Sequence, residues 1–497
     1  MLSLHEVADM TRGRIVSERA HADAVTVSDV STDSRDIAAG SLFVALSGEH
    51  FDGHAYLDDV AARGASAAVV ADGRSSQSLP LIAVEDTRRA LGDLASGWRQ
   101  RFFMPLVVVV GSNGKTTTKE MIAAIFSAAF GEADHCATRG NLNNDIGVPL
   151  TLLGLRTHHR AAVIELGMNH PGETARLAEI AQPSIALVVN AQREHQEFMR
   201  SVEAVADEHA LAIAALSADG VAVFPADDAH ADVWRRAAGA RRVVDFVCVT
   251  DRELTAGVAS VVARAHLETH ETVVHFDTPL GTVTARLAAA GLHNARNAAA
   301  AVAACIAAGA VADIPLDAIR RGIEAFRPMR GRSQRFASPG GTIVIDDSYN
   351  ANPDSMRAAI DLLATHAAPR LLILGDMGEV GGEGPRFHSE VGAYACQRGI
   401  ESLYATGSAS RETVAAFGDR GMHFDDAEAL IEAARAWLLA REEDGRRAAA
   451  SSAASCSVIA SVLVKGSRFM RMERVVAALR GVDLDAVPTA GSKAGAH

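Results

Sequence analysis

The sequence predicts an α/β protein of roughly three domains built on parallel sheets, and two observations support this fold class. The chain has 497 residues, of which 48% are hydrophobic and 22% are charged. That is enough apolar material for several cores at about 150 residues per domain. Short apolar runs alternate with helical patterns along most of the chain, which is typical of folds with parallel sheets.

The apolar runs have the length of strands that are buried on both faces. They lie at 67–70, 106–110, 162–164, 185–189, 342–345 and 371–374. Helical patterns fall between them, for example at 119–130 and 355–366. Residues 241–285 interrupt this order, because they are rich in Val and Thr with partial alternation. We expect antiparallel strands there, inside or beside the central domain.

Charge and cysteine content exclude several classes of protein. With 48 basic and 61 acidic residues the net charge is -13, which argues against a general nucleic-acid binder. The five cysteines form no CxxC pair, so we expect a reducing compartment. The acidic N-terminus does not resemble a signal peptide, and the alanine-rich stretch 298–310 is short for a membrane span. The composition predicts a cytoplasmic protein with no membrane span.

The most informative segment is LVVVVGSNGKTTTKE at 106–120. An apolar strand runs into a glycine turn and then a helix, which is the setting of a phosphate-binding loop. The spacing is a short G-x-x-G-K-T. Lys115 would reach the terminal phosphates and Thr116 would hold Mg²⁺. The predicted nucleotide-binding residues of this loop are Gly111, Ser112, Asn113, Gly114, Lys115, Thr116 and Thr117.

Two features follow the loop. Glu165 ends the next buried strand and is well placed as a Mg²⁺ ligand. Between them, TRGNLNNDIGVPLTLL (138–153) is rich in asparagine. Such residues often make turns, but they can also hydrogen-bond a sugar or phosphate. The candidates for that role are Thr138, Arg139, Asn141, Asn143 and Asn144.

Seven segments together resemble those of the Mur ligases, the ATP-dependent amide ligases of bacterial cell-wall synthesis. They are GSNGKTTT (111–118), TRGNLNNDIGVPLTLL (138–153), ELGMNHPGE (165–173), GLHNARNAAAA (291–301), DDSYNANPDSM (346–356), GDMGEVG (375–381) and VKGSRFMRME (464–473). TDSR (32–35) and GEHFDGH (48–54) are similar to the members that act on peptide-bearing UDP-sugars. Within the family, the later motifs are most similar to the members that add D-alanyl-D-alanine to UDP-N-acetylmuramoyl-tripeptide.

The resemblance implies three domains, at 1–86, 87–329 and 330–497. The Gly-, Ala- and Pro-rich composition after about residue 482 predicts a disordered tail. The first domain would bind the uridine end of the UDP-sugar, and the second ATP. The third, Rossmann-like domain would bind the incoming dipeptide. The implied reaction makes an acyl phosphate from the tripeptide carboxylate and ATP, which the dipeptide amine then attacks. The implied partners are small molecules only, and the implied state is a monomer.

The resemblance also implies roles for residues outside the loop. Lys115, Glu165 and His195 would be catalytic, and His195 would serve a second Mg²⁺. Further ATP contacts would come from Asn294, Asn297, Arg332 and Asp347. Ser34 and Arg35 would lie near the uridine diphosphate. The acceptor site in the third domain would draw on Tyr349, Asn350, Asn352, Asp376, Glu379, His388, Lys465 and Arg468.

One position departs from the family pattern. Many relatives carry a lysine fourteen residues after the histidine, which CO₂ converts to a carbamate that serves the second Mg²⁺. Here that position is His209, and no lysine lies between Lys119 and Lys465. We hypothesise that Glu208, Glu194 or a water on His209 takes this role.

Other functions remain open. The nearest alternatives are related ligases that add the third peptide residue or add glutamates to folate, but DDSYNANPDSM argues against the first and TDSR against the second. A non-catalytic nucleotide-binding relative is favoured only by His209, and Lys115, Thr116, Glu165 and His195 count against it.

Overall fold

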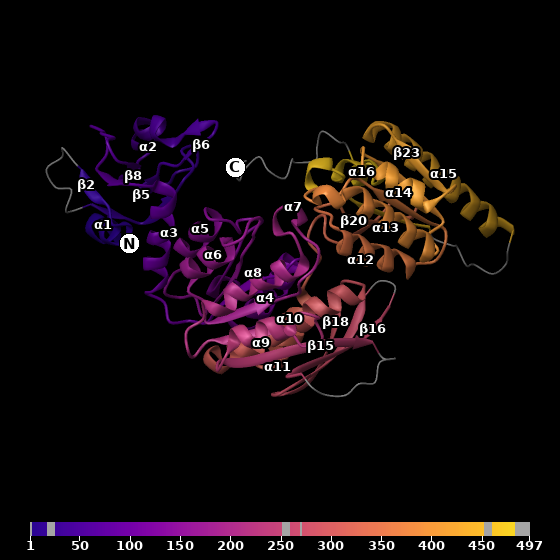
Figure 1. Ribbon diagram of the computed structural model, residues 1–497, viewed down its shortest axis with the longest axis horizontal. Coiled ribbons are helices and arrows are strands. Elements are labelled where there is room, and N and C mark those ends of the chain that lie inside the picture. The colour runs from indigo at the N-terminus through magenta and orange to yellow at the C-terminus, as the bar shows by residue number, and fades with distance from the viewer. Residues whose placement is uncertain (1, 17–24, 251–258, 269–270, 452–459, 483–497) are drawn as a thin grey trace.

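The computed structural model describes residues 2–16, 25–250, 259–268, 271–451 and 460–482, with only the backbone for 444–451. The described residues form three α/β domains, each built on a mainly parallel sheet (Figure 1). The predicted fold class is confirmed. The expected disorder after about residue 482 concerns residues outside the described part.

The first domain has a five-stranded sheet in the order β2-β9-β8-β5-β4, in which only β2 is antiparallel to its neighbour. Its elements are β1 (Leu2–Ser3), α1 (Leu4–Thr11), β2 (Arg14–Val16), β3 (Thr26–Val27), β4 (Asp29–Ser31), β5 (Ser41–Val44), β6 (Ser47–Gly48), β7 (Phe51–Asp52), η2 (Gly53–Tyr56), α2 (Leu57–Ala62), β8 (Ala67–Ala71) and β9 (Leu81–Val84). Helix α3 (Thr87–Arg99) then leads to the second domain.

The second domain has a nine-stranded sheet in the order β11-β12-β10-β13-β14-β15-β16-β17-β18. Its elements are β10 (Leu106–Val110), α4 (Lys115–Phe130), η3 (Glu132–Asp134), β11 (His135–Ala137), α5 (Gly147–Leu153), β12 (Ala161–Glu165), α6 (Glu173–Ala181), β13 (Ile185–Val188), α7 (Gln196–Met199), α8 (Val202–Ala214), β14 (Val221–Pro225), α9 (Ala231–Ala238), β15 (Arg242–Thr250), β16 (Val261–Leu267), β17 (Thr272–Thr278), β18 (Gly281–Leu287), α10 (Leu292–Ala312) and α11 (Leu316–Ala325).

Strand β10 shows why the apolar runs are continuous. Val108 and Val110 face one core cluster, whereas Val107 and Val109 face the other. Helices cover both faces of the sheet, so neither face needs polar residues. The strand ends at Val110, and the glycine-containing loop begins directly after it.

The expectation of antiparallel strands at 241–285 is right for β17 and β18 and wrong for β15. Strand β15 pairs in parallel with β14 on one side and with β16 on the other. Only the last two strands run antiparallel. Helix α9 connects β14 to β15 and supplies the crossover that a parallel pair needs.

Helix α10 is the one described helix that is long and apolar enough to cross a membrane. In the fold it is a core helix, because 78% of its apolar window is buried. It packs against the nine-stranded sheet and against α4. Small alanine side chains let it lie close to both.

The third domain has a six-stranded sheet in the order β19-β20-β24-β21-β22-β23, parallel except for β19. Its elements are β19 (Gln334–Ala337), β20 (Ile343–Asp347), α12 (Pro353–Ala364), β21 (Arg370–Leu374), η4 (Gly381–Glu383), α13 (Gly384–Gln397), β22 (Ser402–Thr406), α14 (Ser410–Phe417), β23 (Gly421–Phe424), α15 (Ala427–Ser451), β24 (Ser461–Lys465), η5 (Arg468–Met470) and α16 (Glu473–Leu479).

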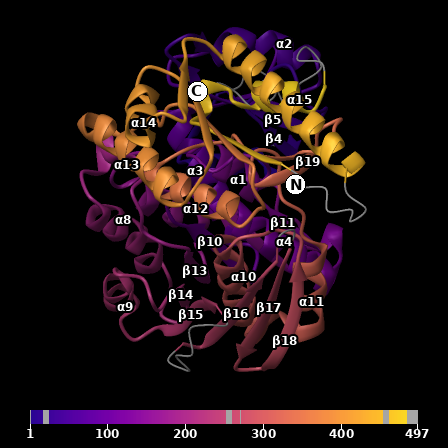
Figure 2. The same cartoon turned by 90° about the vertical axis from the view of Figure 1, so that its right-hand side faces the viewer.

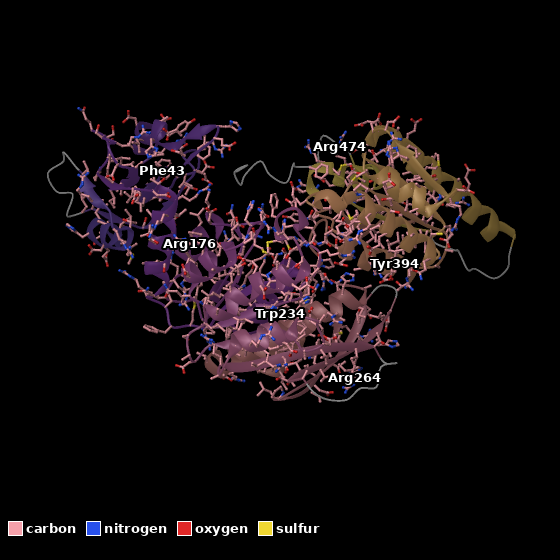
Figure 3. The ribbon with its side chains drawn as sticks, in the orientation of Figure 1. Phe43, Arg176, Trp234, Arg264, Tyr394 and Arg474 are labelled. Carbon is pink, nitrogen blue, oxygen red and sulfur yellow. The ribbon has the colours of Figure 1, made fainter. Side chains whose placement is uncertain are left out.

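The two domain junctions differ in chemistry. The first and second domains share one apolar cluster, to which α3 contributes Leu91 and Leu94. Arg176 lies at this junction (Figure 3) and reaches Asp93 of α3 at 3.6 Å. Among the described residues, the apolar clusters of the third domain include only Ala290 from the second. In both ribbon views α12 lies on the side of the third domain that faces the second (Figures 1 and 2).

Candidate active site

The glycine loop after β10 forms the floor of the site. Gly111 has φ +140° and Gly114, the N-cap of α4, has φ +83°. A Cβ on Gly114 would lie 2.2 Å from Asn297 Oδ1, so a side chain there would displace the Asn297 amide. The loop opens onto the N-terminus of a 16-residue helix, where free N–H groups and the helix dipole favour an anion.

Glu165 stands beside this loop as predicted. It ends β12 and is buried. Its Oε1 accepts hydrogen bonds from Thr116 Oγ1 at 3.2 Å and Asn143 Nδ2 at 2.8 Å. Its Oε2 is buried with no hydrogen-bond partner in the described part of the chain. An unpartnered carboxylate oxygen next to a Thr hydroxyl suits a hard cation.

A buried carboxylate, Glu194, lies on the other side of the loop. Its Oε2 is 3.3 Å from Lys115 Nζ and its Oε1 is 3.2 Å from His209 Nε2. Burial alone would raise the pKa of Glu194, but the Lys115 ammonium and the rings of His209 and His195 outweigh it and hold that pKa at about 2. Glu194 is therefore ionised where the loop would bind phosphates.

Of the residues weighed as a substitute for the missing lysine, Glu208 is engaged elsewhere. Its carboxylate accepts the N–H groups of Gly172 and Thr174 at 2.8 Å each, at the start of α6. Glu194, in contrast, contacts His209 directly.

The third domain completes the site. Lys465 Nζ donates to Asp347 Oδ2 at 2.6 Å. Burial would raise the pKa of Asp347, but this ammonium outweighs it and lowers that pKa. The guanidinium of Arg332 lies 4.2 Å from the ring centroid of Tyr349. His195 Nδ1 lies 2.7 Å from Glu379 Oε2, and this close imidazole lowers the pKa of Glu379.

These groups line one cavity of about 1000 Å³, the upper end of the usual size for a ligand site. The sequence-predicted residues that line it are Ser112, Asn113, Gly114, Lys115, Thr116, Thr117, Asn143, Asn144, Glu165, His195, Asn294, Asn297, Arg332, Asp347, Tyr349, Asn350, Asn352, Glu379 and Lys465. The cavity also reaches Arg88 and Arg176, toward the first domain.

Other predicted residues lie apart from this cavity lining. Asp376 accepts hydrogen bonds from Ser410 N and Oγ. His388 accepts one from Met377 N, and Arg468 pairs with Glu473. The remaining residues outside the lining are Ser34, Arg35, Gly111, Thr138, Arg139 and Asn141.

Two of these have contacts that explain their place. Thr138 is buried, and its Oγ1 accepts the N–H of Glu165 at 2.9 Å, so it fixes the end of β12. Arg35 is exposed and pairs with Asp33 at 2.8 Å. Their roles toward a UDP-sugar stay predictions.

Beside the predicted His195 lie Asn190, Gln192 and Arg193, which link the loop to the third domain and were not predicted from the sequence. Ser112 Oγ accepts the N–H of Gln192 at 2.8 Å, and Asn113 N donates to Asn190 Oδ1 at 3.0 Å. The neighbouring Arg193 pairs with Asp354 and Glu390 of the third domain. The only signal in the sequence was a polar stretch directly after a buried strand.

Comparison with known proteins identifies the family. The family models for the Mur ligase catalytic domain, the Mur ligase middle domain and the Mur ligase glutamate ligase domain match residues 26–99, 109–305 and 331–468. A UDP-N-acetylmuramoyl-tripeptide–D-alanyl-D-alanine ligase of Escherichia coli (strain K12) is 37% identical, over 96% of this chain and 98% of its own.

Solved structures agree. MurF from Acinetobacter baumannii superposes with a TM-score of 0.84 at 29% identity, covering 96% of this chain and 98% of its own. MurF ligase from Thermotoga maritima in complex with ADP has the same fold, with a TM-score of 0.75 at 23% identity, over 93% of this chain and 99% of its own. With both domain order and full-length similarity in agreement, the chain belongs to the Mur ligase family.

Proposed function

We propose that this chain joins D-alanyl-D-alanine to UDP-N-acetylmuramoyl-tripeptide at the expense of ATP. The products are UDP-N-acetylmuramoyl-pentapeptide, ADP and phosphate. The observation that carries the proposal is the cavity in which a phosphate loop, a buried Glu165 and third-domain residues meet. The near full-length similarity to ligases of that name supports the choice of substrates.

The domain limits 1–86, 87–329 and 330–497 belong to this proposal. They are supported by three separate sheets and by the ranges of the family matches. The first would hold the uridine end of the UDP-sugar, the second ATP and the third the dipeptide.

ATP would lie with its phosphates on the loop amides and Lys115. Lys115 Nζ now rests against Gly111 O and Glu194 and can turn to a phosphate. Asn294 and Asn297 at the start of α10 would face the adenine, while Arg332 and Asp347 would reach in from the third domain. All four line the same cavity.

The residues present fit Mg²⁺ at Thr116 and Glu165. Glu165 Oε2 is buried without a hydrogen-bond partner among the described residues. Within the described part of the chain no three His, Cys, Asp or Glu side chains gather to hold a metal alone. Mg²⁺ suits such a site, since it usually takes one or two protein ligands and completes its shell with phosphates and water. A bound Mg²⁺ would neutralise phosphate charge.

The reaction runs in two steps. A carboxylate oxygen of the tripeptide attacks the γ-phosphorus, the bond to the bridging oxygen breaks, and ADP leaves. The dipeptide amine then attacks the acyl carbon, loses a proton, and phosphate departs. The protein mainly orients the reactants and stabilises phosphate charge. Lys115 and the loop amides do this at the transferred phosphate.

Glu194 takes the place of the carbamoyl group that relatives form on lysine. It is a buried, ionised carboxylate held between Lys115 and His209. The chain therefore needs no CO₂ at this position, and His195 and Glu194 together would serve a second Mg²⁺.

A titration tests the Glu194 assignment. Glu194→Gln should raise the Mg²⁺ concentration needed for ADP binding by about tenfold, since one charge-assisted interaction is lost. Glu197→Gln, an exposed change on the adjoining helix, is the control. Calorimetric ADP titrations at several Mg²⁺ levels measure it. Equal Mg²⁺ dependence in both variants would refute the role, as would activity that requires added bicarbonate.

The UDP-sugar would enter between the first and second domains. Asn143 and Asn144 line the cavity at that end, near Arg88 and Arg176. The proposed UDP-sugar set also includes Ser34, Arg35, Thr138, Arg139 and Asn141. The proposed acceptor set consists of Tyr349, Asn350, Asn352, Asp376, Glu379, His388, Lys465 and Arg468. We also propose that the enzyme works in the cytoplasm as a monomer.

Product analysis tests the proposed function. The protein should convert UDP-N-acetylmuramoyl-tripeptide, D-alanyl-D-alanine, ATP and Mg²⁺ to a UDP-pentapeptide detectable by mass spectrometry. If another amino acid or dipeptide is ligated in its place, the acceptor assignment is wrong while the ligase chemistry stands.

A further inference from the structure

The third domain docks on the second mainly through polar groups beside the cavity. Asn113 of the loop and Asn352, which caps α12, exchange amide hydrogen bonds of 3.0 and 3.3 Å. His195 meets Glu379 at 2.7 Å, and Glu197 N donates to the Glu379 carbonyl at 3.2 Å. Because little apolar surface is shared here, the charged contacts carry much of the docking.

Arg193 makes the most extensive of these contacts. Its N–H donates to Asp354 Oδ2 at 2.9 Å, and its guanidinium reaches Asp354 Oδ1 at 2.6 Å and Glu390 Oε2 at 2.8 Å. It also lies 5.3 Å from the ring centroid of the buried Phe387. One arginine thus holds both α12 and α13.

The surroundings strengthen this cluster. The side chains of Arg193, Asp354 and Glu390 are 21%, 23% and 31% exposed, so water screens them less than a surface pair. Asp354 stands in the first turn of α12, where the helix dipole favours a negative charge. Arg357 also donates to Glu390 and stacks on Tyr394, at the face of the third domain turned to the second (Figure 3).

The segment around Arg193 contacts two domains in alternation. Gln192 contacts Ser112 of the phosphate loop, and Glu194 contacts Lys115. Arg193 and His195, between and after them, contact the third domain. Pulling the third domain away would therefore displace the residues that face the phosphates.

We propose that Arg193 is a positioning residue that couples docking of the third domain to the placement of Glu194 and His195. The docking role stands on the contacts alone, and the catalytic consequence rests on the proposed function. Neither Arg193 nor its partners needs to touch a substrate.

Small-angle scattering and kinetics on the full chain test this. Arg193→Gln, Asp354→Asn and Glu390→Gln should each increase the radius of gyration of the ligand-free protein. Each should lower kcat at least about tenfold, as expected for misplaced reactive groups. ADP affinity should fall as well, because Arg332 and Asp347 of the third domain line the same cavity as the loop and would move away with that domain. The Arg193→Gln/Asp354→Asn double variant should be little worse than either single variant.

Arg370→Gln is the matched control. Arg370 binds Glu401 in a similar two-point contact at 2.7 and 3.0 Å, but both residues belong to the third domain. Its loss should lower thermal stability and leave the radius of gyration unchanged. Arg193→Lys should restore part of kcat, since the charge returns without the two-point geometry.

Two results would overturn the proposal. One is an unchanged radius of gyration in folded Arg193→Gln. The other is additive effects in the double variant. If scattering responds as expected but no variant or wild-type protein ligates the dipeptide, the docking role stands and the proposed function fails.

Discussion

Gly114 is a position in the site where a larger residue is strongly disfavoured. Its φ of +83° strains any residue with a side chain, and an added Cβ would lie 2.2 Å from Asn297 Oδ1 and displace that amide. Gly114→Ala should weaken ADP binding at least about tenfold, because the left-handed backbone at the helix N-terminus is strained for alanine and the Asn297 amide is displaced. Gly73→Ala is a matched control, with φ +80° but no atom within 4 Å of an added Cβ. Calorimetric titration compares them, and equal affinities would contradict the tight packing of the loop.

We propose that Lys115 carries the charge that faces the transferred phosphate. Lys115→Ala should lower the rate of ATP turnover by about 100-fold or more, as for loss of a preorganised charge at the transition state. Phosphate release under saturating substrates measures this. A variant with near-normal turnover would show that the loop is not the catalytic phosphate site.

Among the site residues, those that belong to locally recognisable sequence patterns could be predicted from the sequence. Lys115, Thr116 and Glu165 follow from strands and turns that can be recognised locally. Arg193 could not be predicted, because Asp354 and Glu390 lie 161 and 197 residues away along the chain. Thr138 was predicted to contact a sugar or phosphate, but its side chain accepts a hydrogen bond from the backbone N–H of Glu165.

Among the elements, the crossing of α11 over α4 sets a sharp limit on side-chain size. A Cβ on Gly322 would lie 2.4 Å from Ile125 Cα, which is backbone and cannot turn aside. Gly322→Ala should lower the free energy of unfolding by about 1–3 kcal/mol. Gly309→Ala on α10, whose nearest atoms are 3.8 Å away, should be neutral or stabilising by up to about 1 kcal/mol. Urea titrations measure both, and equal losses would contradict this packing.

The elements buried on both faces were the most predictable. Apolar runs such as 106–110 and 371–374 became β10 and β21, because burial on both sides leaves a continuous signal. The direction of the strands at 241–285 was harder to predict from the sequence. A Val- and Thr-rich run favours a strand in either direction, and only pairing with β14 made β15 parallel.

The whole molecule combines one apolar and one polar domain junction. The first and second domains share a core cluster, whereas the third docks through ion pairs and amides. Calorimetric unfolding of the ligand-free protein should therefore show two transitions, one for the first two domains together and one for the third. Added salt should weaken the docking of the third domain, so the two transitions should become more independent of each other. A single transition at all salt concentrations would contradict this.

Phosphate transfer and amide formation are both expected to take place in the cavity between the second and third domains. The most direct measurement is phosphate release from ATP and Mg²⁺ with UDP-N-acetylmuramoyl-tripeptide, in the presence and absence of D-alanyl-D-alanine. We expect sustained release only when both substrates are present, with one phosphate per pentapeptide formed. Release that ignores D-alanyl-D-alanine, or no release with both substrates, would contradict it.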